Sequence, residues 1–169
     1  QRGKLKEALK YYNEALQIKE KIGDKNGIAT TLYNMAMVLS GLGKYESALT
    51  QCRRSLDISK SIGDIGGVSH ALIALGILCK TLGAYEEALH SYKESLEIVE
   101  KTRNPHILTA NLINIGTIHL ERGEYDKCAE ALEKSEKVAR AMKNPPLLFR
   151  AIITKARLYF LTGTPTKAC

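Results

Sequence analysis

Two asparagines are the side chains of this sequence best suited to holding another polypeptide. Asn34 and Asn114 stand 80 residues apart, each within a stretch whose apolar residues recur at helical spacing. An amide supplies a hydrogen-bond donor and an acceptor, so it can pair with the backbone of an extended peptide without requiring particular side chains. The same amide could instead bond within its own scaffold or to water. Both interpretations are open at this point.

Two arginines near the C-terminal end suit an anionic ligand. Arg150 and Arg157 are seven residues apart, which places them about two helical turns apart on one face. Guanidinium groups bind carboxylate and phosphate oxygens through paired hydrogen bonds. With the basic residues of segment 137–143, they predict a basic end to a binding groove for an acidic or phosphorylated ligand. The alternative is a basic face that meets only solvent.

Residues that could bind metal or catalyse a reaction are scattered. The four histidines lie in different segments: His70, His90, His106 and His119. None has the spacing of a zinc site, and His119 falls at a position expected inside the helix packing. A phosphate-binding loop, a nucleophile elbow and a pair of carboxylates in one pocket are also missing from the sequence. The sequence therefore predicts no metal, no cofactor and no enzymatic activity.

These side chains belong to a unit that repeats every 40 residues. Full copies occupy 24–63, 64–103 and 104–143, and partial copies occupy 1–23 and 144–169. A period of this length indicates a stack of small units, none of which can bury its apolar face alone. We predict one elongated domain over 1–169, as a fragment of a longer chain, because both ends cut through a repeat. The apolar faces left at the cut ends predict some self-association.

Residues typical of helix starts and helix ends recur within each repeat, and they predict two helices joined by a tight turn. Residues suited to cap a helix precede each first helix at equivalent positions: Asp24, Asp64, Asn104 and Asn144, with Pro105 and Pro145 after the last two. Glycines are placed to end each first helix in a left-handed conformation: Gly3, Gly43, Gly83, Gly123 and Gly163. The predicted fold class is all-α.

Small residues form two columns, one in each helix of the repeat. The first helices carry Ala36, Gly76, Gly116 and Ala156, and the second helices carry Ala8, Ala48, Ala88, Cys128 and Ala168. A glycine inside a helix costs roughly 1 kcal/mol relative to alanine. Two glycines at one position therefore need a packing reason, and we predict that the facing helices approach closely there.

The first helices also carry apolar residues away from the face that should meet the core. These are Tyr33, Met37, Ile73, Ile77, Ile113, Leu120, Ile153 and Phe160. A helix that is apolar nearly all round is either buried or presents a binding surface. Neighbouring helices could cover these side chains, or the side chains could line a groove for a peptide.

Charge and cysteine usage limit the function classes. The net charge of +7 arises after residue 136, because residues 1–136 hold 18 acidic and 18 basic residues. The basic surplus suggests nucleic-acid binding, but aromatic platforms and a continuous basic stripe are missing. Cys52, Cys79, Cys128 and Cys169 lack a metal or disulfide spacing, which favours reduced, buried thiols. With no signal peptide or membrane-spanning run, we expect a soluble chain in the cytoplasm with no membrane partner.

The repeat 64–103 carries the pattern of a known family at these residues: Leu72, Leu75, Gly76, Gly83, Tyr85, Ala88, Tyr92 and Leu96. It resembles the tetratricopeptide repeat (TPR), whose usual period is about 34 residues. The longer variant is similar to the arrays of kinesin light chain, of spindle-orientation adaptors and of bacterial signalling proteins. Three residues depart from the pattern: Cys128, Pro165, and Lys155 at a core-facing position.

The resemblance implies a right-handed superhelical α-solenoid of antiparallel helix pairs, in which the first helices line a concave groove. It implies that Asn34 and Asn114 hold a peptide backbone. Tyr33 stands where the carboxylate-clamp variant of the family has a lysine, which argues against that variant. The expected peptide-binding residues are Tyr33, Asn34, Met37, His70, Ile73, Ile77, Ile113, Asn114, Thr117, Arg150 and Arg157.

These features favour a protein-interaction scaffold that binds a peptide segment of a partner, acidic or phosphorylated at the C-terminal end. The alternative is a regulatory or sensor array of a larger signalling enzyme or transcription regulator, which the flanking sequence would distinguish. A nucleic-acid-binding solenoid is the third hypothesis.

Overall fold

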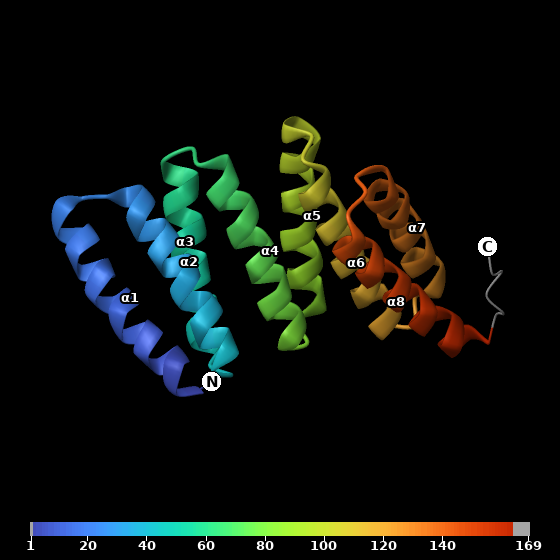
Figure 1. Ribbon diagram of the computed structural model, residues 1–169, viewed down its shortest axis with the longest axis horizontal. Coiled ribbons are helices and arrows are strands. Elements are labelled where there is room, and N and C mark those ends of the chain that lie inside the picture. The colour runs from blue at the N-terminus through green and yellow to red at the C-terminus, as the bar shows by residue number, and fades with distance from the viewer. Residues whose placement is uncertain (1, 164–169) are drawn as a thin grey trace. The chain divides into compact units, whose positions relative to one another are not determined.

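The structure, a computed structural model, describes residues 2–163, apart from the side chains at positions 100 and 101. Eight helices follow one another in this part: α1 (Arg2–Ile22), α2 (Lys25–Gly41), α3 (Tyr45–Ser61), α4 (Ile65–Thr81), α5 (Tyr85–Thr102), α6 (Pro105–Glu121), α7 (Tyr125–Ala141) and α8 (Pro145–Thr162) (Figure 1). No strand occurs among residues 2–163, so the predicted all-α class is confirmed. None of the described helices could span a membrane. Positions 1 and 164–169, including Pro165, Ala168 and Cys169, lie outside the described residues.

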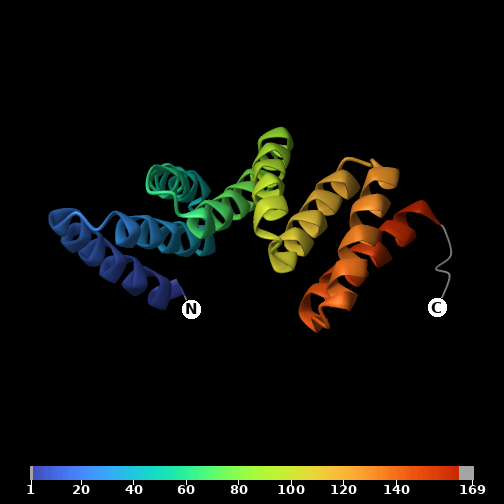
Figure 2. The ribbon, with the colours of Figure 1, turned by 90° about the horizontal axis from the view of Figure 1, so that it is seen from above.

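The helices form two compact units, Gln1–Ser91 (unit 1) and Tyr92–Cys169 (unit 2). In unit 1, α1 packs on α2, α2 on α3 and α3 on α4, and α2 also touches α4. In unit 2, α6 packs on α7 and α7 on α8, and α6 also touches α8 (Figure 2). Within each unit, the first helices of neighbouring repeats are therefore in contact. This consecutive packing of helix pairs is that of an α-solenoid, as predicted.

The predicted caps begin the first helices. In unit 1, Asp24 Oδ1 accepts a hydrogen bond from Gly27 N at 2.8 Å, and Asp64 Oδ1 accepts one from Gly67 N at 2.9 Å. In unit 2 the caps are amides followed by prolines: Asn104 with Pro105, and Asn144 with Pro145. Each cap satisfies an N–H that has no partner within its own helix.

Left-handed residues separate the helices. The predicted glycines have φ angles of 77° at Gly43, 77° at Gly83, 72° at Gly123 and 64° at Gly163. The turns between repeats have the same conformation, at Gly23 and Gly63 in unit 1 and at Arg103 and Lys143 in unit 2. The prediction for Gly3 is wrong, since Gly3 lies in the first turn of α1.

The close approach predicted from the small residues is confirmed at Gly116. A Cβ atom on Gly116 would lie 3.2 Å from Cγ of Leu132 and 3.5 Å from Cβ of Ala131, both on α7. Other members of the two columns are buried as well: Ala36, Ala48, Gly76, Ala88 and Cys128. Ala156 is exposed, so the prediction fails on α8, and Ala168 lies outside the described residues.

Lys155, which departs from the repeat pattern, forms an ion pair with Glu136. Its Nζ lies 3.0 Å from Glu136 Oε2, and the side chains are only 24% and 18% exposed. The equivalent positions one hundred and twenty residues earlier are Leu16 and Met35, which belong to one apolar cluster. An ion pair between α7 and α8 therefore occupies the place of an apolar contact between α1 and α2.

Three cysteines are buried, free thiols, as predicted: Cys52, Cys79 and Cys128. Burial raises the pKa of Cys52 to about 12 and the pKa of Cys79 to about 11. Cys52 also donates a hydrogen bond to the Ala71 carbonyl oxygen, with the two atoms 3.2 Å apart. These thiols therefore stay protonated at neutral pH.

Candidate functional site

Two first helices of unit 1 present apolar side chains to solvent. Met37 on α2 is 43% exposed, and Ile77, at the equivalent position of α4, is 38% exposed. Their neighbours Tyr33, Asn34 and Ile73 are half-buried, and His70 is exposed. We call this surface the α2–α4 face and define it by Tyr33, Asn34, Met37, His70, Ile73 and Ile77. It gathers all the predicted site residues of unit 1.

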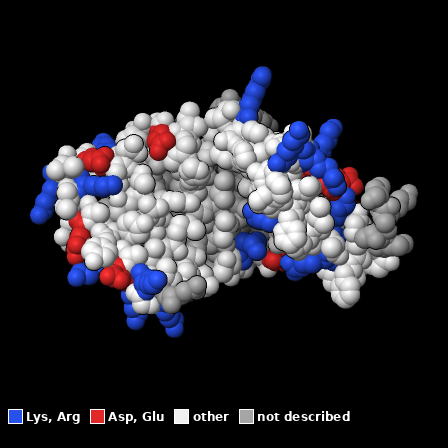
Figure 3. All heavy atoms as spheres, in the orientation of Figure 1, with Lys and Arg blue, Asp and Glu red and all other residues white. Residues whose placement is uncertain are grey.

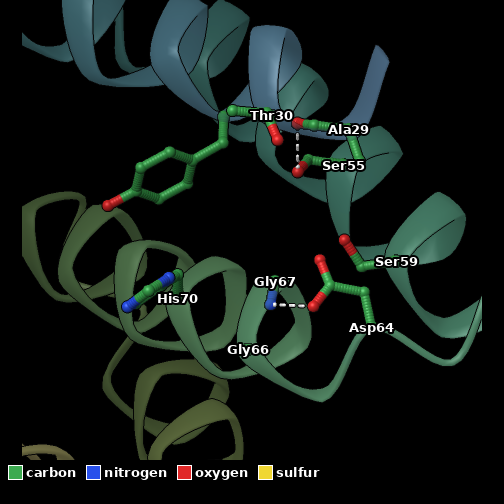
Figure 4. A pocket seen from close by; sticks show the side chains of 9 residues that line it. Ala29, Thr30, Ser55, Ser59, Asp64, Gly66, Gly67 and His70 are labelled. Carbon is green, nitrogen blue, oxygen red and sulfur yellow. Dashed lines mark hydrogen bonds between the residues drawn. The ribbon is translucent and has the colours of Figure 1, made fainter. Parts of the chain in front are cut away.

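A pocket of about 290 Å³ lies between α2, α3 and α4, near the start of α4. It is lined by Ala29, Thr30, Tyr33, Ser55, Ser59, Asp64, Gly66, Gly67 and His70 (Figure 4). The rings of Tyr33 and His70 are in contact, with centroids 6.2 Å apart and planes inclined by 37°. The structure thus brings together two predicted site residues from neighbouring repeats.

Apart from Tyr33 and His70, the polar residues of this pocket were not predicted from the sequence to belong to a site. Ser55 Oγ donates to the Ala29 carbonyl at 2.8 Å, and Asp64 caps α4. The Ser59 hydroxyl is fully buried and has no hydrogen-bond partner within residues 2–163. In Figure 4 the side chains of Ser59 and Asp64 point toward Gly67. The available signal was the change of residue type at one repeat position, which holds Lys19, Ser59, Val99 and Ala139 in turn.

The two predicted asparagines differ in their surroundings. Asn34 is half-buried, and its amide makes no hydrogen bond with another described residue. Asn114 is only 7% exposed, and its Oδ1 accepts a hydrogen bond from Arg150 Nη2 at 3.2 Å. Asn114 is therefore bound within its own scaffold, whereas the Asn34 amide has no such partner among the described residues.

The apolar residues predicted for unit 2 fall into two groups. Ile113 and Leu120 on α6 are buried, with exposed fractions of 2% and 4%. Thr117, between them, donates its hydroxyl to the Ile113 carbonyl oxygen at 2.8 Å. Ile153 and Phe160 on α8 are 45% and 87% exposed. Of these predicted apolar residues, the two on α6 are therefore covered and the two on α8 are accessible to a ligand.

The basic residues of unit 2 are partly neutralised. Arg140 and Lys155 both bind Glu136, at 2.7 Å and 3.0 Å. The hydrogen bond from Arg140, followed by that from Lys155, holds the pKa of the Glu136 carboxyl below its usual value. Arg150 and Arg157 are exposed, and Arg157 has no polar partner in the described part of the chain. Figure 3 shows Lys and Arg side chains gathered over α8.

The histidines form no common site. His119 Nδ1 lies 2.9 Å from Glu124 Oε2, so this half-buried ring has the internal partner expected of it. His106 Nδ1 lies 3.2 Å from the Asn144 amide nitrogen. Among residues 2–163, no three His, Cys, Asp or Glu side chains are grouped so that they could hold a metal ion.

Helix pairs stacked in sequence order define an α-solenoid repeat protein. The tetratricopeptide repeat profile matches residues 1–61 and 27–101, which together cover more than half of the chain. The chain therefore belongs to the tetratricopeptide repeat family, as its resemblance indicated. A profile of anaphase-promoting complex subunit 5 matches residues 100–158.

Solved structures of low sequence identity share the fold. BtubC (BKLC) from P. vanneervenii is 22% identical, with a TM-score of 0.76 over 84% of this chain and 59% of that chain. A Rap protein complexed with Competence and Sporulation Factor is 20% identical, with a TM-score of 0.77 over 92% and 47%. A signal transduction ATPase (STAND) with a tetratricopeptide repeat sensor from Pyrococcus horikoshii is 21% identical, with a TM-score of 0.81 over 95% and 25%.

The chain spans between 25% and 59% of the length of these three proteins. No curated protein sequence matches it. The similarities therefore establish its fold and its family.

Proposed function

We propose that this chain is a protein-interaction scaffold, without catalytic activity, whose α2–α4 face binds a peptide segment of a partner protein. The observation that carries the proposal is the exposure of Met37 and Ile77 at equivalent positions of two touching helices. Exposed apolar side chains that adjoin one another are typical of an interaction surface. The pocket between α2, α3 and α4 is lined by Tyr33 and His70 of the same face and offers a recess for one side chain of the peptide.

The unpaired amide of Asn34 supports an extended peptide. Its N–H and C=O groups can pair with the peptide backbone, while the apolar side chains around it receive alternate side chains of the ligand. Figure 3 shows few charged side chains over α4, so apolar and backbone contacts would dominate there.

An acidic or phosphorylated segment is our proposal for the ligand of α8 in unit 2. Arg157 is exposed and unpaired within the described residues, and Arg150 is exposed beside the Asn114 amide. Exposed Ile153 and Phe160 on the same helix add apolar contact area. Mixed acidic and apolar segments complement such a surface.

The second candidate is a sensor or regulatory array within a larger signalling enzyme or transcription regulator. The similar P. horikoshii protein is an ATPase with a tetratricopeptide repeat sensor, and this chain spans 25% of its length. Such a protein would still use the α2–α4 face for its ligand. A catalytic or DNA-binding domain in the flanking sequence would favour this candidate over an adaptor.

A peptide-display selection tests the proposal directly. We expect one class of peptide to bind saturably, and the double substitution Met37→Glu with Ile77→Glu to weaken it by about tenfold or more, because it places two charges against apolar ligand groups. The matched control is Ile18→Glu, which changes a 60% exposed isoleucine on α1. Failure to select any saturable peptide, or equal binding to the double variant, would contradict the proposed function.

The proposal for α8 has its own test. Arg157→Glu should weaken an acidic or phosphorylated peptide and reduce the dependence of its affinity on salt. Lys93→Glu is the control, since it makes the same charge change at an exposed position of α5, outside the proposed basic site. Equal losses in both variants would show a general effect of net charge and would contradict a site at Arg157.

A further inference from the structure

We propose that the pocket beside Asp64 is a receptor for a lysine side chain, which the partner segment inserts between α2, α3 and α4. This inference rests on the proposed function and adds the chemistry of one ligand residue to it. It is drawn from a comparison of two equivalent helix starts, those of α2 and α4.

At the start of α2, the chain fills the equivalent space with a lysine of its own. Lys19, on α1, donates from Nζ to the Gly27 carbonyl oxygen at 3.2 Å. Its Cδ lies 2.8 Å from the place where a Cβ on Gly27 would be. The half-buried lysine therefore runs across the face of Gly27, beside the capping carboxylate of Asp24.

The start of α4 has the same capping aspartate and the same glycine three residues later, but it lacks the lysine. Asp64 caps the helix and its carboxylate lies against the face of Gly67, as Asp24 does at Gly27 in the preceding repeat. Ser59 stands at the position equivalent to Lys19. Because the serine side chain is shorter by three heavy atoms, it leaves the pocket of about 290 Å³.

Three oxygen atoms of this pocket have unused acceptor capacity. The Gly27 carbonyl accepts from Lys19 and from Thr31 Oγ1 at 2.7 Å, whereas no described side chain donates to the Gly67 carbonyl, since Ala71 replaces Thr31. The Ser59 hydroxyl is buried without a partner, and Asp64 Oδ2 accepts no hydrogen bond from a described residue. An ammonium group carries three N–H donors and matches such a set of acceptors.

A cation fits this site better than an anion. Asp64 is the one carboxylate among the lining residues, and it would repel an acidic side chain. The ring of Tyr33 can pack against the methylene groups of a lysine and attract its charge. The volume lies just below the range of about 300–1,000 Å³ found for small-molecule sites, which suits a single side chain.

A lysine probe and its uncharged analogue test the proposal. We would titrate the protein with N-acetyl-lysine methylamide and with N-acetyl-norleucine methylamide, and follow backbone amide resonances by NMR. The lysine probe should shift the Gly66 and Gly67 amides saturably, and norleucine, which lacks the ammonium group, should not. Equal shifts with both probes, or none with lysine, would overturn the proposal.

Two reciprocal substitutions provide matched variants. Ser59→Lys should fill the pocket from within and abolish the shifts caused by the lysine probe. Lys19→Ser should open a second site and produce new saturable shifts at Gly27. If Ser59→Lys does not fold, Asp64→Asn serves instead: it keeps a capping side chain and should weaken the probe by about tenfold, the effect of one lost charge-assisted hydrogen bond. Asp24→Asn should leave probe binding at Gly67 unchanged.

The outcomes separate this inference from the proposed function. Selected peptides that lack lysine, or that bind Ser59→Lys as well as the original chain, would overturn the lysine receptor and leave the scaffold function standing. Saturable binding of the lysine probe, blocked by Ser59→Lys, would support the receptor even if the display selection gave no peptide.

Discussion

The turns between repeats are built differently in the two units. In unit 1 the left-handed residue is Gly23 or Gly63, followed by an aspartate cap and, three residues later, by a glycine. In unit 2 it is Arg103 or Lys143, with φ angles of 50° and 51°, followed by asparagine and proline. Glycine adopts this conformation without strain, whereas an arginine or a lysine does so at a cost.

The two turn types have different consequences for binding. The glycine three residues after the aspartate leaves room for the capping side chain, because a Cβ on Gly67 would overlap the Asp64 carboxylate. Unit 2 has Ile107 and Leu147 at these positions, and proline fixes the first turn of each helix. At the start of α4, unit 1 therefore has a pocket beside Gly67, whereas unit 2 has an apolar side chain at the equivalent position of each first helix.

The contact between the second helix of one repeat and the first helix of the next also differs between the two units. Leu16 and Met35 of unit 1 pack within an apolar cluster, and Glu136 and Lys155 of unit 2 form an ion pair at the equivalent positions. This repeat therefore accommodates either an apolar contact or an ion pair at this place, provided that both facing residues change together.

The largest expected effect comes from Gly116→Leu. Its side chain would collide with Leu132, which replaces the smaller Cys52 of unit 1. We expect a loss of more than about 2 kcal/mol in the free energy of unfolding, measured by urea denaturation. Ala156→Leu, at the equivalent but exposed position, should change it by less than about 0.5 kcal/mol. An unchanged urea midpoint for Gly116→Leu would refute the close contact between α6 and α7.

Breaking the ion pair should have the next largest effect. Lys155→Met leaves Glu136, whose side chain is mostly buried, with Arg140 as its ion-pair partner, and should lower the unfolding free energy by about 1 kcal/mol. Adding Glu136→Leu restores the apolar pair of unit 1 and should recover the loss. If the double variant is less stable than Lys155→Met alone, the apolar contact between α1 and α2 cannot replace the ion pair between α7 and α8.

Exchanging glycine and lysine at the left-handed turn positions should change the free energy of unfolding by a smaller amount, with opposite signs in the two units. Lys143→Gly should stabilise the chain by roughly 0.5 kcal/mol, because it relieves a strained φ angle at some cost in chain entropy. Gly63→Lys should destabilise it by roughly 1 kcal/mol. Thermal unfolding of both variants measures the difference, and a shift of the same sign in both would contradict the role assigned to the φ angle.

The smallest expected effect is on the pH dependence of stability. The lowered pKa of Glu136 means that its contribution is present above the unfolded-state pKa of about 4.3 and is lost as the pH falls through the folded-state value. The variant Glu136→Leu with Lys155→Met lacks this contribution, so its urea midpoint should fall less on acidification. Parallel pH profiles for the two proteins would show that Glu136 gains nothing from its partners.

Much of the fold could be predicted from the sequence. Periodicity, caps and glycines define the helices, because these signals are local and are repeated several times along the chain. Gly3 was misassigned because it has the residue type of a helix end but lies in the first turn of α1. The single-domain prediction for 1–169 stays a prediction.

The candidate site was predictable only in part. Exposed Met37 and Ile77 follow from the pattern of α2 and α4, whereas the burial of Ile113 depends on neighbours that a helical pattern does not specify. The hydrogen bond from Arg150 to Asn114 could not be predicted either, because the two residues are 36 positions apart in the sequence. The pocket at Ser59 depends on the packing of three helices around a short side chain, which the helical pattern does not specify.

The buried thiols give the chain built-in reporters of local opening. Cys52, Cys79 and Cys128 lie in α3, α4 and α7, and their inaccessible, protonated sulfurs cannot react with an alkylating agent while these helices stay packed. The alkylation rate of each sulfur therefore measures how often its own helix detaches. Mass spectrometry of partly alkylated protein would then give the order in which the helices of this array come apart.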